Sequence, residues 1–166
     1  MVETRDVRVT RTPRALRDYG RRLALLFRES GADGIRGAVV LLEGDLGAGK
    51  TLLVQAMLAG LGVSHDVKSP SFDLVHRHDL PDGGMAYHVD LYRLREAPAP
   101  DELDVDDPDG LVLVEWGAAW RSWYPRRWEI SLEILPDDAR RVTVEHVDDT
   151  GDAPRRGDGP REVRTE

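Results

Sequence analysis

One segment of the sequence combines glycines, a lysine and a hydroxyl group at the spacing that phosphate chemistry uses. Residues 44–51 read GDLGAGKT and match the pattern G-x-x-x-x-G-K-[ST] in full. Glycines let the backbone curl so that its N–H groups surround phosphate oxygens, and the start of the following helix adds a positive dipole. Lys50 is placed to reach the β- and γ-phosphates, and the Thr51 hydroxyl to ligate Mg²⁺. The sequence therefore predicts a site for a nucleoside triphosphate. The predicted phosphate-binding residues are Gly44, Asp45, Leu46, Gly47, Ala48, Gly49, Lys50 and Thr51.

Two carboxylates follow apolar segments in the second half of the chain. Glu115 ends the run LVLVE, and Asp90 ends the run MAYHVD, with His88 two residues earlier on the same strand face. Side chains at the carboxyl ends of such strands meet the ligand crevice. Phosphoryl transfer requires a carboxylate near the metal and a group that orients the attacking molecule. We therefore predict Asp90 and Glu115, together with Lys50, as the catalytic residues.

The identity of the base follows from a motif that the sequence lacks. GTPases of the common kind read guanine through N-K-x-D. Only two of the 23 basic residues are lysines, and the second, Lys68, lies in the sequence VKS. The guanine motif is therefore absent, which favours ATP.

The elements that must position these residues are those of an α/β fold. Residues 38–43 form an uninterrupted apolar run typical of a buried parallel strand, and residues 50–61 predict a helix that ends at Gly62. Together they predict a P-loop NTPase-like domain whose mixed sheet is flanked by helices. Further expected elements are strands at 5–10, 72–78, 85–91 and 111–115, a helix at 12–30, a loop at 95–110 and a hairpin at 128–135 and 141–147.

Length and composition fit one soluble domain without cysteine chemistry. The 166 residues carry a formal net charge of −8 and include no cysteine, which excludes disulfides and thiolate metal sites. No apolar run reaches the roughly 18 residues of a membrane span, and the first residues lack the apolar stretch of a secretory signal. We therefore expect a cytoplasmic protein. Residues 1–147 predict an ATPase domain, and residues 148–166, which lack apolar periodicity, predict a disordered charged tail.

Four segments together resemble a known family. Residues 44–51 (GDLGAGKT), 67–72 (VKSPSF), 88–94 (HVDLYRL) and 114–116 (VEW) are similar, in order and spacing, to the bacterial TsaE (YjeE) family. The similarity covers about residues 12–147. It implies the P-loop ATPase subunit of the machinery that makes N6-threonylcarbamoyladenosine at position 37 of tRNAs reading codons that start with A.

The resemblance also implies roles for individual residues. Thr51 and Glu115 correspond to the Mg²⁺ ligands, and Asp90 to an acid that is important for hydrolysis. Ser69 and Ser71 fall in a switch-like loop that faces the γ-phosphate. Serine hydroxyls in such a loop can sense a γ-phosphate, and a proline-containing loop can move as a unit.

Two further residues predicted to bind the nucleotide are adjacent in sequence to the predicted metal ligands. Trp116 corresponds to the tryptophan that follows the metal-binding glutamate, and Leu52 follows the Mg²⁺-binding threonine. The chain departs from the family pattern at Leu52, where a second Thr or Ser is common, and at Ser71, where Thr is usual. The acidic, proline-rich segment between Leu94 and Leu111 also differs from the helical stretch that the family usually has there.

Three functions remain open, and the resemblance to the TsaE family names the partners in the first of them. The leading hypothesis is a regulatory Mg-ATPase that resets a TsaB–TsaD partner complex, while a TsaC-type enzyme supplies the threonylcarbamoyl-adenylate. The alternatives are a small-molecule P-loop kinase and a nucleotide-sensing module without turnover. The acidic net charge argues against strong direct nucleic-acid binding in any of these roles.

Overall fold

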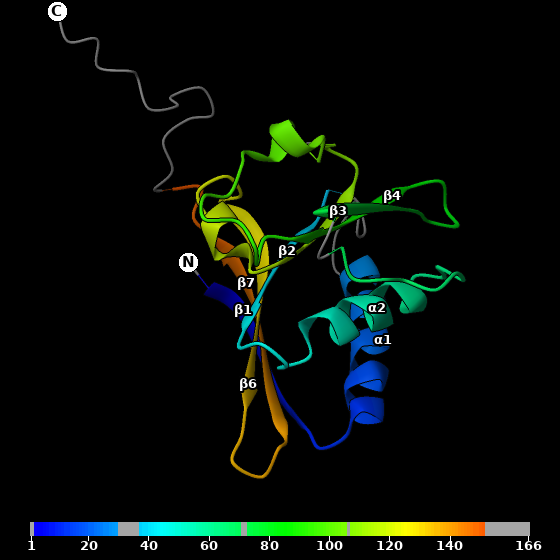
Figure 1. Ribbon diagram of the computed structural model, residues 1–166, viewed down its shortest axis with the longest axis vertical. Helices are drawn as coiled ribbons and strands as arrows, with labels where there is room; N and C mark the ends of the chain where they lie inside the picture. The colour runs from blue at the N-terminus through cyan, green and yellow to red at the C-terminus, as the bar shows by residue number, and fades with distance from the viewer. Residues whose placement is uncertain (1, 30–36, 71–72, 106, 152–166) are drawn as a thin grey trace, which may run out of the picture.

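The computed structural model describes residues 2–29, 37–70, 73–105 and 107–151 (Figure 1). Within these ranges the chain forms a seven-stranded sheet in the order β1-β7-β6-β2-β5-β4-β3 and two α-helices. The predicted α/β fold is confirmed. The strands are β1 (Val2–Thr10), β2 (Val39–Gly44), β3 (Val75–Asp79), β4 (Met85–Asp90), β5 (Leu111–Glu115), β6 (Arg126–Ile134) and β7 (Arg140–Asp148), and the helices are α1 (Pro13–Glu29) and α2 (Lys50–Gly60).

The sheet is mixed, as predicted, with its parallel strands in the middle. β2 pairs in parallel with β5 on one side and β6 on the other, and β4 pairs in parallel with β5. β3, β7 and β1 are antiparallel to their neighbours. The apolar runs of β2 and β5 suit these central places, because strands there are buried on both faces. The register sets Asp90 opposite Glu115 at the carboxyl ends of β4 and β5, so the two predicted acids are neighbours.

Both α-helices cover the same face of the sheet (Figure 1). The Thr12 hydroxyl caps α1 by accepting a 3.1 Å hydrogen bond from the backbone N–H of Ala15, and Pro13 occupies the first helical position. The apolar stripe of α1 packs against α2, where a Cβ on Gly20 would lie 2.8 Å from that of Ala56. In the described ranges, no helix has both the length and the apolarity to span a membrane.

The opposite face of the sheet is covered without α-helices. Residues 91–105 pack against it and include the short 3-10 helix η1 (Pro100–Leu103), while η2 (Gly117–Trp120) follows β5. Trp120 is fully buried there, and its Nε1–H donates a 2.8 Å hydrogen bond to the carbonyl of Pro98. The loop expected at 95–110 is therefore interrupted by one short helical turn.

The last strand extends slightly into the segment predicted as a tail. β7 ends at Asp148, whose carboxylate accepts hydrogen bonds from the backbone and the hydroxyl of Thr150. Asp149 pairs with Arg127 at 3.0 Å. The rest of the predicted tail, residues 152–166, lies outside the described residues.

Candidate nucleotide site

The loop between β2 and α2 has a backbone that depends on glycine. Gly44 and Gly47 have φ angles of 143° and 79°, which residues with a side chain rarely adopt. Gly44 also packs so closely that a Cβ would lie 2.3 Å from the carbonyl oxygen of Leu132 on β6. The N–H of Ala48 donates a 3.1 Å hydrogen bond to the carbonyl of Asp45, which folds the loop back on itself. This curl delivers the next residues of the motif to the first turn of α2.

Lys50 is the buried cation of this loop. Its side chain is 5% exposed, and Nζ donates hydrogen bonds to the carbonyls of Gly44 and Asp45, the latter at 3.1 Å. Nζ also lies 3.6 Å from the ring centroid of Trp116, within the range of a cation–π interaction. Lys50 and Trp116, which were each predicted as nucleotide-binding residues, are thus in direct contact.

Several carboxylates lie within electrostatic reach of the Lys50 ammonium. Burial lowers the pKa of Lys50, because an ammonium loses its hydration there. Glu115, Glu43, Asp90 and Asp45 oppose this shift in the pKa, since each negative charge favours the protonated form. The site therefore holds one buried positive charge among several acids, an arrangement suited to a polyanion that arrives with a divalent cation.

The two predicted acids are buried at the strand ends. Glu115 is 3% exposed, and its Oε2 accepts a 2.8 Å hydrogen bond from the Thr51 hydroxyl. Its Oε1 lies 2.8 Å from Nε2 of His88, which is fully buried. Asp90 is 6% exposed, and its Oδ1 accepts a 3.0 Å hydrogen bond from the N–H of Tyr92. The structure thus brings Thr51, Asp90 and Glu115 together around the start of α2.

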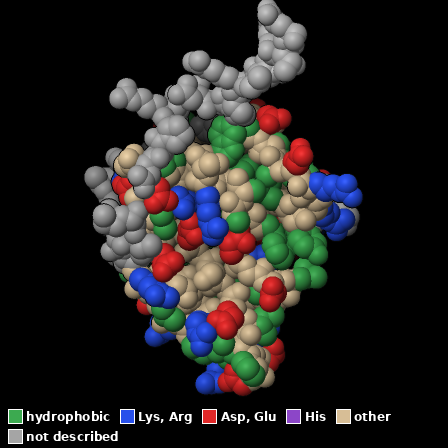
Figure 2. All heavy atoms as spheres, turned by 90° about the vertical axis from the view of Figure 1, so that its left-hand side faces the viewer, with side chains coloured by type: hydrophobic (Ala, Val, Ile, Leu, Met, Phe, Trp, Pro, Cys, Tyr) green, Lys and Arg blue, Asp and Glu red, His purple; other side chains and the backbone are tan. Residues whose placement is uncertain are grey.

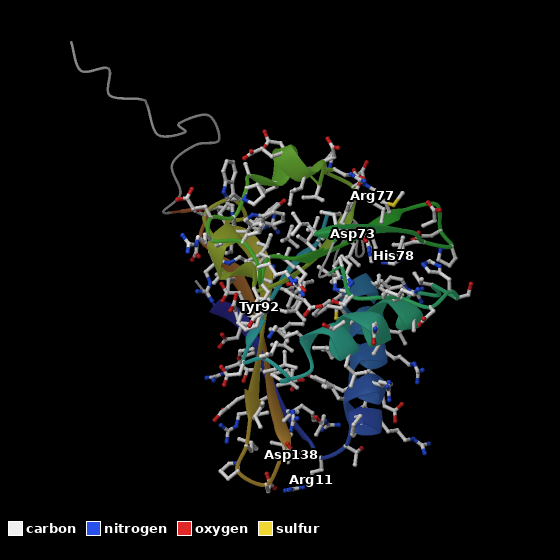
Figure 3. All side chains as sticks on the ribbon, in the orientation of Figure 1. Arg11, Asp73, Arg77, His78, Tyr92 and Asp138 are labelled. Atoms are coloured by element: carbon white, nitrogen blue, oxygen red, sulfur yellow. The ribbon has the colours of Figure 1, made fainter. Side chains whose placement is uncertain are left out.

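An open cleft of about 400 Å³ connects these groups. Tyr92 lies at this cleft, beside the loop that leads from β2 into α2 (Figure 3). Its ring lies 4.8 Å from that of Trp116, centroid to centroid. The predicted residues Gly44, Asp45 and Ala48 shape the loop from outside this lining. The cleft is lined by Leu46, Gly47, Gly49, Lys50, Thr51, Leu52, Gln55, Asp90, Tyr92, Glu115 and Trp116.

The predicted switch-like loop is only partly described. Ser71 lies outside the described residues. Ser69 lies in the segment that connects α2 to β3. It is half-buried and is not among the residues that line the cleft. The loop is nevertheless tied to the site, because the Gln55 amide donates a 2.7 Å hydrogen bond to the carbonyl of Val67. Gln55 is thus the described link between the cleft and this loop.

Three further residues that contact the candidate site have no role in the sequence prediction. His88 and Tyr92 stand in the segment HVDLYRL, where Asp90 alone was singled out. Gln55 follows Thr51 by four residues, which places both on one face of α2. This helical spacing is the signal that could have found Gln55, whereas the contacts of His88 and Tyr92 depend on the strand order.

A glycine loop between a buried strand and a helix, with acids at the ends of adjacent parallel strands, defines a P-loop nucleotide-binding protein. A sequence model of one family, described as "Threonylcarbamoyl adenosine biosynthesis protein TsaE", matches residues 10–143. The chain belongs to the TsaE family.

Individual proteins support this assignment over most of their length. The tRNA threonylcarbamoyladenosine biosynthesis protein TsaE of Streptomyces coelicolor is 38% identical over 145 residues, covering 84% of this chain and 86% of that protein. The protein of the same name from Bacillus subtilis is 36% identical over 116 residues, covering 67% and 71%. The crystal structure of YdiB from Bacillus subtilis superposes with a TM-score of 0.69 at 29% identity, covering 89% of this chain and 88% of that one.

Proposed function

We propose that this chain is a Mg²⁺-dependent ATPase. One observation carries the proposal: the cleft joins Lys50 and Thr51 of the loop to Asp90 and Glu115 at the ends of adjacent strands. In phosphoryl transfer the protein supplies positioning and charge compensation more than covalent chemistry. This cleft offers a lysine for phosphate oxygens, a hydroxyl and a carboxylate for the metal, and a second carboxylate for the attacking water.

The donor atoms fit a magnesium ion. Thr51 and Glu115 present oxygen atoms, which Mg²⁺ prefers over nitrogen or sulfur ligands. In the part of the chain that the structure describes, no group of three or more His, Asp or Glu side chains is arranged to hold a metal. A Mg²⁺ ion bound through Thr51 and Glu115 would complete its shell with water and phosphate oxygens, as it commonly does. When bound, the ion neutralises charge on the β- and γ-phosphates.

The remaining residues have distinct tasks in hydrolysis. Lys50 compensates charge on the phosphates, and Asp90 orients the attacking water. Asp90 is suited to this task because its Oδ1 is already fixed by the N–H of Tyr92, which holds the carboxylate at the cleft. ATP is the nucleotide, since the sequence lacks the N-K-x-D element that selects guanine.

The family relationship supports a biological task for the proposed ATPase. The relatives are named for tRNA threonylcarbamoyladenosine biosynthesis, and we propose that this chain supports that modification in the cytoplasm. It does so by regulating or resetting a TsaB–TsaD partner complex rather than by transferring the threonylcarbamoyl group. We expect no strong tRNA contact by this chain itself, because its formal net charge of −8 disfavours binding to the phosphate backbone. Figure 2 shows acidic and basic side chains interspersed on one face instead of a continuous basic surface.

A nucleotide titration tests the proposed ligand. Binding of fluorescent ATP and GTP analogues to the purified chain is measured with Mg²⁺ and with EDTA. The proposal expects preference for the ATP analogue and tighter binding with Mg²⁺. Equal affinity for both nucleotides would contradict the choice of base, and binding indifferent to Mg²⁺ would contradict the metal site.

A further inference from the structure

His88 is a buried polar residue whose presence the proposed hydrolysis does not explain. It lies on β4 between Ala86 and Asp90, on the sheet face that the α-helices cover. Its side chain is fully buried, and Nδ1 has no hydrogen-bond partner within the described residues. A buried polar ring is costly unless a specific contact offsets the lost hydration. The contact that the structure provides is the 2.8 Å one from Nε2 to Oε1 of Glu115.

This contact completes the fixation of one carboxylate. Thr51 donates to Oε2 of Glu115 and His88 meets Oε1, so each oxygen has its own partner. A carboxylate can only accept hydrogen bonds, which assigns the proton to Nε2 and makes His88 the donor. The two donors come from different elements, α2 and β4. Rotation of the Glu115 carboxylate would therefore break both contacts. The plane of the carboxylate is therefore set from both sides.

We propose that His88 is a positioning residue: its Nε2–H holds the Glu115 carboxylate so that Oε2 is aimed at Thr51 and at the metal. The inference rests on the proposed function, in which Thr51 and Glu115 bind Mg²⁺. Hydrogen-bonded partners of metal ligands commonly change metal affinity by about 10- to 100-fold when they are removed. His88 touches neither phosphate nor water in this account, and it acts through Glu115 alone.

Three substitutions separate positioning from simple core packing. His88→Met introduces an apolar side chain of similar length and removes the N–H donor. His88→Gln places an amide N–H near the position of Nε2, so it can restore the bond to Glu115. His88→Asn carries the same amide on a shorter side chain that cannot reach Oε1. If His88→Met does not fold, the comparison of the Gln and Asn variants still decides the question.

His78 supplies a matched control on the same sheet face. It lies on β3, is 4% exposed, and has its Nδ1 2.8 Å from Nε2 of His65. Figure 3 shows His78 apart from Tyr92 and therefore from the cleft. His78→Met removes a buried histidine without touching Glu115, so it reports the effect of core disturbance alone.

The experiment titrates Mg²⁺ into each folded full-length variant in the presence of a fluorescent ATP analogue, with a parallel titration in EDTA. The proposal expects His88→Met and His88→Asn to need about 10- to 100-fold more Mg²⁺ for half of the effect. It expects unchanged nucleotide affinity in EDTA, recovery in His88→Gln, and wild-type behaviour in His78→Met.

Three results would overturn the inference alone. They are a wild-type Mg²⁺ requirement in His88→Met and His88→Asn, a loss of nucleotide affinity that is equal with and without Mg²⁺, and a Gln variant no better than the Asn variant. Absence of any Mg²⁺ effect in the wild type would instead overturn the proposed function, and the inference with it.

Discussion

The Thr51 hydroxyl donates a 2.8 Å hydrogen bond to Oε2 of Glu115, joining the first turn of α2 to the end of β5. The glycine loop fixes the position of Thr51, and the pairing of β5 with β2 and β4 fixes that of Glu115. Both residues carry side-chain oxygen atoms and line the cleft. The pair therefore links the phosphate loop to the carboxylates that the proposed chemistry requires.

Replacement of Glu115 by glutamine should separate metal binding from phosphate binding. Glu115→Gln keeps the size of the side chain but removes the charge that attracts Mg²⁺. We expect the Mg²⁺ requirement for ATP binding to rise by at least about 10-fold, with binding in EDTA unchanged, in an equilibrium titration. Glu133→Gln, at an exposed β6 residue paired with Arg141, is the control. An unaltered Mg²⁺ requirement in Glu115→Gln would remove Glu115 from the metal site.

Two glycines of the loop should respond differently to alanine. Gly47 has a φ of 79° with open space around it, so Gly47→Ala should cost about 1–2 kcal/mol of unfolding free energy. Gly44→Ala adds a clash with the carbonyl of Leu132, and we expect a loss of at least about 3 kcal/mol. Urea denaturation measures both. Equal losses would show that the close approach of Gly44 to β6 does not constrain the loop.

Stability should fall in mild acid because of His78. Burial, assisted by His65, lowers the pKa of His78 to about 4 from an ordinary value near 6.5. Between these values the unfolded chain binds a proton that the folded chain does not, so stability present above pH 6.5 is lost as the pH falls. Relative to His78→Leu, the wild type should lose about 2 kcal/mol more between pH 7.5 and pH 5.

Urea denaturation at the two pH values measures this difference. His76→Leu, a change at a more exposed residue on the same face of β3, should keep most of the wild-type pH dependence, because burial and not the charge of His76 is the largest cause of the lowered pKa of His78. If the His78→Leu variant retains it as well, His78 is not the group responsible.

The chain after Gly151 should be dispensable for the nucleotide site. We propose that residues 1–147 form the ATPase domain, because the residues that line the cleft lie between Leu46 and Trp116. A variant that ends at Gly151 retains the pair of Asp149 with Arg127. Its ATP affinity and phosphate release should match those of the full chain. A marked loss of either would assign a function to residues 152–166.

Much of the fold was predictable because apolar runs and turn residues act locally. The runs at 38–43 and 111–115 predicted β2 and β5, and Thr12-Pro13 predicted the start of α1. The strand expected from residue 72 begins at Val75, because Leu74 has a φ of 64° and donates to the carbonyl of Pro70, which forms a turn. A hydrophobic pattern does not report such a turn.

The sequence predicted which residues would meet at the candidate site better than it predicted the contacts between them. The motif predicted Lys50 and Thr51, and strand ends predicted Asp90 and Glu115. The contact of His88 with Glu115 depends on β5 lying between β2 and β4, an order that spacing along the chain does not specify. The same holds for the ring of Trp116 beside Lys50. Long-range pairing determines both contacts.

Phosphate release from ATP is the most direct test of the proposed function. It is measured for the purified chain alone and with purified TsaB and TsaD, in the wild type and in Asp90→Asn. We expect slow release alone, faster release with the pair, and a loss of about 10²- to 10⁴-fold in Asp90→Asn with ATP binding retained. Phosphate release that does not change when TsaB and TsaD are added, or that Asp90→Asn leaves unchanged, would contradict the regulatory ATPase. Phosphate that appears on a small molecule in place of inorganic phosphate would identify a kinase instead.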